Sequence, residues 1–154
     1  MRLEDLPDLP LLLDEVLEAT MALQRADFGY IQLLDDETAT LMIAAHRGVG
    51  PDFLEHFETV DANDTSPCGL ALKTGRRIVV EDVTTDPGYA QHRAIAAATG
   101  FRTVLSTPLF ERGTSKPIGV LSTLFRLPCR PKKEDLRIAD LLARQAADMI
   151  FSEL

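Results

Sequence analysis

The chain has 154 residues, a length that suits one domain with a core of its own. Apolar residues make up 45% of it and charged residues 26%, as is usual for a globular protein. The formal net charge of −8 argues against a nucleic-acid partner, because its phosphates would be repelled. No apolar stretch approaches the roughly 20 residues of a membrane helix, so no membrane partner is expected.

The two cysteines, Cys68 and Cys129, form neither a disulfide framework nor a metal-binding spacing. The N-terminus is acidic and lacks the apolar segment of a signal peptide. We therefore expect a cytoplasmic location, where thiols stay reduced.

The chain begins with a helical pattern. Apolar residues recur at spacings of three and four between Leu9 and Leu23, which predicts an amphipathic helix, and Asp8 is its expected N-cap. Two strands follow, at 28–34 and 40–46, separated by a polar turn. They predict a first β-hairpin.

The middle of the chain predicts shorter elements, each ended by turn residues. They are a short helix at 52–57, a polar loop at 61–67, a helical turn at 69–74, a strand at 78–80 and an alanine-rich helix at 89–99. Gly75 is expected in the left-handed conformation that ends many helices.

Residues 103–125 contain nearly the same phrase twice, VLSTPLF and VLSTLF, separated by a polar turn. This pattern predicts a second hairpin that is buried on both faces. Pairing its strands about Thr114 places Ser106 opposite Ser122. Because side chains alternate along a strand, the serines and threonines point to opposite faces, and only one pair can line a pocket.

The final segment, 132–154, predicts the longest helix, with an apolar stripe that continues to the last residue. Such a pattern is expected of a helix that continues into a longer protein. The order of elements predicts an α+β domain with a mainly antiparallel sheet. We expect a single domain over 1–154, divided into an N-terminal helix at 1–26, a sheet and pocket at 27–127, and the C-terminal helix at 132–154.

At this point the chain resembles a GAF domain, a small-molecule sensing module, over nearly its whole length. The resemblance rests on residues 68–75, 78–83 with Asp86-Pro87, Thr107-Pro108-Leu109 and 118–121. Residues 136–148 look like the exit helix of GAF domains in bacterial sensor histidine kinases. The resemblance implies a roughly six-stranded antiparallel sheet, with terminal helices that often dimerise on one face. Short helices and loops on the other face would enclose a ligand pocket. It also implies a local irregularity at Pro108, which does not suit a central strand.

Cys68 is the one candidate for catalysis. It lies at a possible helix start, where backbone N–H groups stabilise a thiolate, and its segment resembles methionine sulfoxide reductases of GAF fold. Those enzymes carry further cysteines near the position of Tyr89, where this chain has none. Without a partner thiol the oxidised cysteine cannot be resolved, so we expect Cys68 to be a buried structural residue. A covalent bilin is not expected either, because no cysteine accompanies His92.

The histidines show no metal spacing, and no Ser/His/Asp set stands out. We expect no catalytic residue, no metal and no cofactor. His56 is expected on a solvated face, and the same reading is favoured for His92 and Arg93. Asp82 is expected to cap the following turn. The candidate ligand-binding residues are Tyr30, Cys68, Asp82, Tyr89, His92, Arg93, Ser106 and Ser122.

The leading hypothesis is a non-catalytic sensory domain that binds an unidentified small molecule. Its terminal helices would form a homodimer and relay the signal to an output module such as a histidine kinase. Two alternatives stay open at this point. One is a reductase that acts through Cys68, and the other is a structural dimerisation module whose pocket is filled by side chains.

Overall fold

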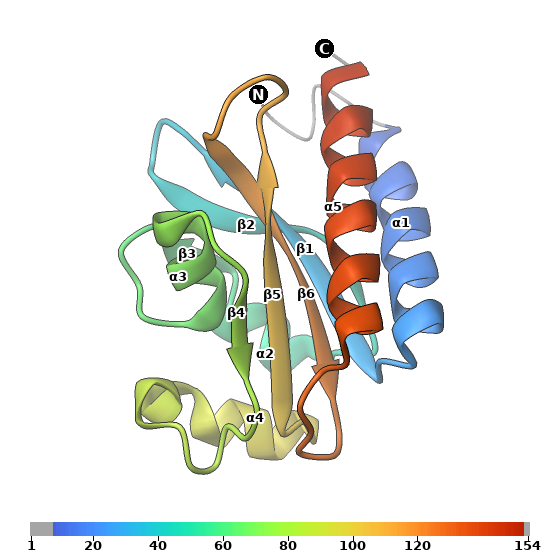
Figure 1. Ribbon diagram of the computed structural model, residues 1–154. Helices are drawn as coiled ribbons and strands as arrows, with labels where there is room; N and C mark the ends of the chain where they lie inside the picture. Colours follow the sequence, from blue (N-terminus) through green and yellow to red (C-terminus); the bar gives the residue numbers. More distant parts are fainter. Residues whose placement is uncertain (1–7, 153–154) are drawn as a thin grey trace.

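The computed structural model describes residues 8–152, which form an α+β domain built on one antiparallel sheet (Figure 1). The six strands lie in the order β3-β2-β1-β6-β5-β4. Their bounds are β1 Phe28–Asp35, β2 Thr40–Arg47, β3 Thr59–Asp61, β4 Ile78–Val80, β5 Thr103–Phe110 and β6 Pro117–Phe125. The predicted fold class is confirmed.

Five of these strands, and both hairpins, were predicted from the residues themselves. The exception is β3, whose start lies outside every predicted element and whose end lies in the predicted loop at 61–67. It has three residues, of which only Val60 is buried. The equally short β4 is entirely apolar, whereas β3 has polar residues on both sides of Val60, so no apolar run marks it in the sequence.

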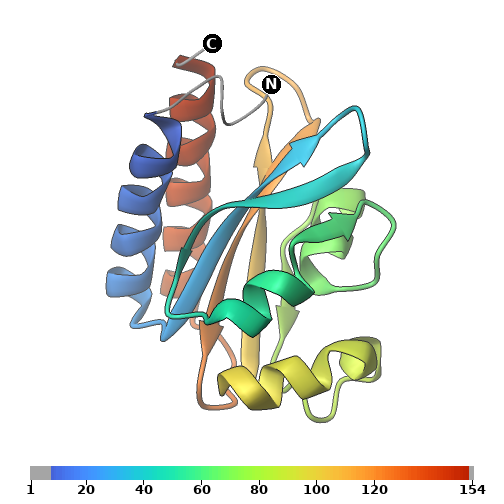
Figure 2. The same ribbon diagram turned by 180° about the vertical axis from the view of Figure 1, so that it is seen from behind.

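One face of the sheet is covered by α1, Leu9–Gln24, and α5, Lys133–Ser152. The two helices run antiparallel and side by side (Figures 1 and 2). The predicted helices reached into 1–7 and 153–154, which lie outside the described residues. Asp8 occupies the N-cap of α1, but its side chain makes no capping bond, so that detail of the prediction was wrong. Pro10, at the helix start, suits a position that needs no N–H donor.

The other face is covered by short segments: α2 Pro51–His56, α3 Pro67–Thr74, the 3-10 helix η2 Pro87–His92 and α4 Arg93–Thr99 (Figure 2). The single helix predicted at 89–99 is therefore two helices. α3 starts earlier than predicted, because Ser66 caps it by accepting a hydrogen bond from the Gly69 N–H. Gly75 ends it at φ 66°, in the left-handed region as predicted.

The register of the late hairpin is the predicted one. Ser106 lies opposite Ser122, and their hydroxyl oxygens are 2.7 Å apart in a buried hydrogen bond. Pro108 is tolerated because β4 pairs only with residues 104–106, so β5 has a single neighbour at this point. A register shift follows at Leu109, one residue beyond the irregularity that was expected at Pro108.

No helix within the described residues is both long enough and apolar enough to cross a membrane.

Gly119 allows β6 to approach β1 closely. A Cβ at this position would collide with the backbone carbonyl of Gln32 and press on the Leu33 side chain. We expect Gly119→Ala to lower the free energy of unfolding by about 1–3 kcal/mol, because a carbonyl in the ladder cannot move aside. Urea denaturation measures the change. Gly50→Ala is the control, since its Cβ would meet nothing within 4 Å, and equal losses in both variants would contradict the explanation.

Candidate functional site

The two serines of the late hairpin lie on the face of the sheet that carries the short helices. They are two residues away from Val104, Val120 and Leu124 and share a face with them, and these three residues pack into the buried cluster on that face. The threonines Thr107 and Thr123 therefore point toward the terminal helices. The serine pair is the one that faces the expected pocket.

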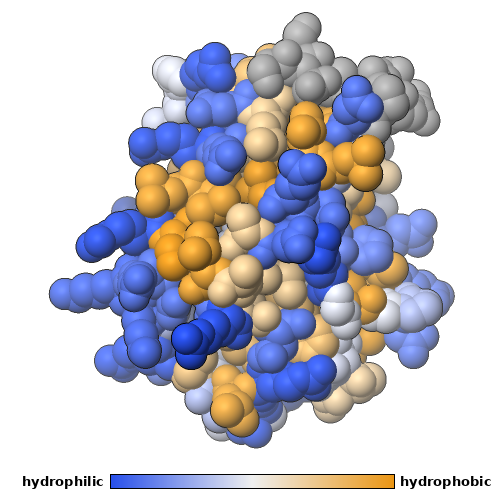
Figure 3. Space-filling model, turned by 90° about the vertical axis from the view of Figure 1, so that its right-hand side faces the viewer, coloured by the Kyte–Doolittle hydropathy of each residue, from blue (hydrophilic) through white to orange (hydrophobic). Residues whose placement is uncertain are grey.

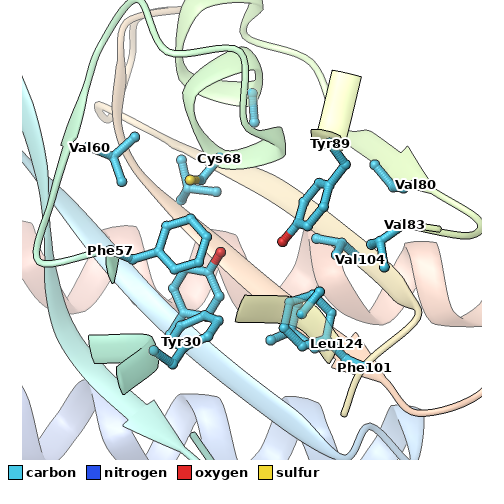
Figure 4. Close-up of a cluster of buried hydrophobic side chains, with 14 of the residues drawn as sticks. Tyr30, Phe57, Val60, Cys68, Val80, Val83, Tyr89, Phe101, Val104 and Leu124 are labelled. Atoms are coloured by element: carbon cyan, nitrogen blue, oxygen red, sulfur yellow. The ribbon is translucent and has the colours of Figure 1, made fainter. Parts of the chain in front are cut away.

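The interior beneath the short helices is filled by aromatic rings (Figure 4). Phe53 is central: its ring centroid lies 4.7 Å from that of Phe57, 5.2 Å from that of Tyr30 and 6.1 Å from that of Phe101. Tyr89 continues the cluster, 6.2 Å from Phe101. Figure 4 shows the hydroxyl groups of both tyrosines directed into this interior. We call these five residues the aromatic cluster.

Gln32 is the residue of this interior that the sequence analysis missed. It lies on β1 two residues after Tyr30, on the same face, and its side chain is fully buried. Neither its amide nitrogen nor its amide oxygen makes a hydrogen bond of standard geometry, and its nearest polar neighbour is the Cys68 thiol, whose pKa it lowers. Buried amides are normally paired, and leaving one unpaired costs about 1–3 kcal/mol. The available signal was a glutamine within the apolar run FGYIQLL.

Cys68 lies beside these polar groups, at the start of α3. Its sulfur is 3.2 Å from the Ser66 hydroxyl, and the Gln32 and Tyr30 side chains also influence its ionisation. Burial raises the pKa of the Cys68 thiol and outweighs these favourable contacts. The thiolate expected from a helix start is therefore disfavoured, and the prediction of a buried cysteine is confirmed. Cys129 is exposed.

Both tyrosines of the aromatic cluster are held in their neutral form. Burial is the main cause that raises the pKa of Tyr30 and of Tyr89, and the nearby Cys68 adds to the rise in each case. The Ser122 hydroxyl opposes it slightly at Tyr30. At neutral pH both hydroxyls carry their proton and can donate hydrogen bonds.

His92 is buried, contrary to the expectation of a surface residue. Its Nδ1 lies 2.8 Å from Nε2 of His56, which is exposed as predicted. Its own Nε2 lies 3.5 Å from the Asp64 carboxylate. Burial lowers the pKa of His92 against the opposing effect of Asp64. Among the described residues, no group of three His, Cys, Asp or Glu side chains is arranged to hold a metal ion.

Asp82 and Arg93 hold a loop together. Asp82 accepts two hydrogen bonds from Arg102, at 2.9 and 2.7 Å, and two from the backbone and hydroxyl of Thr84. Arg93 donates to the carbonyls of Val83 and Asp86. The preferred reading of Asp82 as a cap is confirmed.

The structure thus brings together five of the candidate ligand-binding residues: Tyr30, Cys68, Tyr89, Ser106 and Ser122. His92 borders them, with its ring 5.4 Å from Tyr89 and 5.2 Å from Phe57. Asp82 and Arg93 bind other protein groups instead. The resulting site is an enclosed aromatic interior with neutral hydroxyls, a thiol and one unpaired amide, and it contains no buried charged side chain among these groups.

The architecture is that of an α+β domain whose antiparallel sheet is covered on both faces. Residues 7–150 match the family model described as GAF domain, so the chain belongs to the GAF domain family. The predicted resemblance is confirmed. A curated relative, the methyl sulfide methyltransferase-associated sensor of Methanosarcina acetivorans, is 25% identical over 107 residues. The match covers 69% of this chain and 11% of the relative, so the chain spans about a tenth of that protein.

Solved structures from other proteins share the fold. The GAF domain of a phosphoenolpyruvate-protein phosphotransferase from Coxiella burnetii has a TM-score of 0.81 and 20% identity, covering 95% of this chain and 84% of that chain. A domain described as part of a two-component sensor histidine kinase from Sinorhizobium meliloti has a TM-score of 0.72 and 20% identity, covering 92% and 90%. A free methionine-R-sulfoxide reductase from Thermoplasma acidophilum has a TM-score of 0.72 and 19% identity, covering 96% and 98%. These likenesses show the fold alone.

The Asp82–Arg102 pair gives the domain a pH-dependent stability. The hydrogen bonds from Arg102 and Thr84 hold the pKa of Asp82 well below its usual range. A carboxylate whose folded pKa lies below its unfolded value of about 3.9 stabilises the fold fully above that pH, and loses its effect as the pH falls toward the folded pKa. We therefore expect Asp82→Asn to lower the free energy of unfolding near neutral pH, and the difference from the wild type to shrink below about pH 4.

Urea denaturation across this pH range measures the effect. Asp36→Asn is the control, because that carboxylate is exposed and its partner Lys116 lies 3.8 Å away. A difference between Asp82→Asn and the wild type that stayed constant from neutral to acidic pH would contradict the assignment.

Proposed function

We propose that this domain is a non-catalytic sensor that binds a small molecule on the short-helix side of the sheet and relays the binding through its terminal helices. The observation that carries the proposal is the Gln32 amide, which is fully buried with both polar atoms unpaired. A ligand with a matching donor and acceptor would satisfy it. The neighbouring hydroxyls of Tyr30, Tyr89 and the serine pair supply further polar contacts for such a ligand.

In this proposal the ligand enters by displacing side chains of the aromatic cluster. The aromatic cluster occupies the interior, so the short helices and their loops must shift to admit a molecule. These elements are short and lie on the surface, which is typical of segments that open at low cost. The two arrangements of the cluster, closed and open, are the two states that a sensor requires.

The central strands provide the route to the terminal helices. Tyr30 and Gln32 face the aromatic cluster, whereas Ile31 and Leu33 alternate with them and pack in the cluster that contains α1 and α5. A shift of β1 therefore acts on both faces. We propose a cytoplasmic signalling protein in which an output module such as a histidine kinase reads the arrangement of α1 and α5.

The reductase alternative has the fold of a known enzyme class but little support at Cys68. The raised pKa keeps this thiol protonated, whereas a catalytic cysteine acts as a thiolate. The structural alternative rests on a specific observation, the filling of the interior by the aromatic cluster. Both alternatives make Gln32 irrelevant to binding, which allows a direct comparison.

Gln32→Met separates the sensor from the structural module. Without ligand, we expect the variant to be more stable than the wild type by about 1–2 kcal/mol, because it removes an unpaired buried amide. In a thermal-shift screen of small metabolites, with cyclic nucleotides tested first, a hit at 100 times its dissociation constant stabilises the wild type by about 2.7 kcal/mol. The same hit should stabilise Gln32→Met far less.

The matched control is Gln24→Met, which removes another partly unpaired buried amide, on α1. It should keep the full response to the ligand. If the screen gives no hit on the wild type, the structural module is favoured. If Gln32→Met responds as strongly as the wild type, the ligand does not bind at this amide.

The proposed homodimer uses the outer surface of the terminal helices. Leu11 and Leu23 on α1 and Leu141 on α5 are large apolar side chains left exposed, at 68%, 60% and 56%. Figure 3 shows hydrophobic side chains spread over this face between polar ones. Such exposure on two adjacent helices favours association with a second copy.

Leu23→Glu should weaken the dimer at least about tenfold, because it places a charge where an apolar side chain would be buried. Sedimentation equilibrium measures the dissociation constant. Leu127→Glu is the control, since Leu127 is 76% exposed but lies outside both helices. A wild type that is monomeric, or a dimer that both variants weaken equally, would contradict the proposed interface.

A further inference from the structure

A cleft of about 920 Å³ lies beside β5 where that strand extends beyond β4, between α5 on one face of the sheet and the end of α3 on the other. Its walls are the α3–β4 connection, the β5–β6 turn and the middle of α5, and β5 contributes to its floor. Figure 1 shows where α3, β5 and α5 lie in the fold. None of its lining residues belongs to the aromatic cluster. The volume falls within the range of small-molecule sites, roughly 300–1,000 Å³.

The charges of the cleft differ from those of the chain as a whole. Four arginines and three carboxylates line it, whereas the chain carries a net charge of −8. Two of the arginines are neutralised across the cleft. Arg77 forms two hydrogen bonds to Asp140 on α5, at 3.1 and 3.0 Å, and Arg112 contacts Asp148 at 3.2 Å.

The other two arginines are free. Within the described residues, the guanidinium groups of Arg76 and Arg144 have no hydrogen-bond or ion-pair partner. They come from opposite walls, the α3–β4 connection and α5. The carboxylate of Glu111, on the β5–β6 turn, is the third acidic group of the lining. Two unpaired guanidinium groups on facing walls favour an anion between them.

The floor of the cleft supplies a second observation, which is independent of the arginines: an unpaired hydroxyl. Thr107 on β5 is buried, lines the cleft, and its hydroxyl has no hydrogen-bond partner. A buried hydroxyl normally has one. Beside it lie the apolar surfaces of Pro108, Ala143 and Ala147. The cleft therefore combines free cationic groups, an unpaired hydroxyl and an apolar surface.

We propose that this cleft is a second binding site, which takes a small organic anion bearing a carboxylate or phosphate group. Arg76 and Arg144 bind the anionic group, and a small shift of the floor exposes the buried Thr107 hydroxyl, which donates to that group or to a neighbouring oxygen of the ligand. The apolar floor receives the carbon skeleton. Because α5 forms one wall, an occupied cleft ties this helix to the α3–β4 connection in addition to the Arg77–Asp140 pair.

The experiment is a titration of the ¹⁵N-labelled chain, followed by two-dimensional NMR. The probes are succinate, glycerol 3-phosphate and inorganic phosphate, with sodium chloride at matched ionic strength as the salt control. We expect saturable shifts at Gly75, Arg76, Thr107 and Gly113 with at least one probe. Succinate and the two phosphates distinguish a carboxylate site from a phosphate site. Glycerol 3-phosphate should bind more tightly than inorganic phosphate if the apolar floor contributes.

Variants then test the assigned groups. Arg76→Gln and Arg144→Gln should each raise the apparent dissociation constant of the binding probe about tenfold or more, because each removes a charged hydrogen-bond donor. Thr107→Val should weaken binding while the fold is kept, since the side chain keeps its shape. The control is Arg137→Gln, on the same helix but outside the cleft lining, and it should leave the constant unchanged.

The proposal is overturned if all three probes give only the non-saturating shifts that sodium chloride gives. It is also overturned if a probe saturates elsewhere on the chain, or if Arg137→Gln weakens binding as much as the two cleft variants. These results can be read without any ligand at Gln32, because neither Gln32 nor the aromatic cluster lines the cleft.

Discussion

The domain depends on one constraint, that its central strands are buried on both faces. β1, β6 and β5 lie inside the sheet, with α1 and α5 on one side and the short segments on the other. The alternation of side chains divides each strand between two separate cores. Tyr30 packs with the aromatic rings, for example, whereas Ile31 packs with the terminal helices. A shift of register by one residue would exchange these two sets of side chains, so the register is strongly determined.

Double burial makes every polar side chain on these strands costly unless it has a partner. Ser106 and Ser122 satisfy each other across the hairpin. Gln32 and Thr107 have no such partner and face opposite sides of the sheet. The contrast is informative because all four lie within the same three strands. Packing alone gives no reason to retain an unpaired amide and an unpaired hydroxyl, since apolar side chains of similar shape would be more stable there.

The sequence was sufficient to predict a structural feature where the physical cause of that feature was local or repeated along the chain. The doubled VLST phrase predicted the late hairpin and the Ser106–Ser122 pairing, because a polar turn and alternating side chains leave few registers. The sequence was insufficient where a feature depends on contacts between segments that are far apart along the chain. His92 is buried because its ring packs against Phe57 and Tyr89, and no pattern within the alanine-rich segment indicates the contact with Phe57. Gln32 was visible as a polar residue in an apolar strand, but its lack of a partner depends on the side chains that β2, β6 and α3 place around it.

The two proposed sites meet at β5, where Ser106 and Thr107 are consecutive residues that point to opposite faces. A ligand beside the serine pair and an anion beside Thr107 would therefore contact the same short stretch of backbone. Such proximity creates coupling only if each ligand prefers one arrangement of that strand and of α5 over another. The register shift at Leu109 and the absence of a β4 partner beyond Ser106 leave this part of β5 less constrained than its beginning. Two arrangements would therefore cost less here than at the beginning of β5.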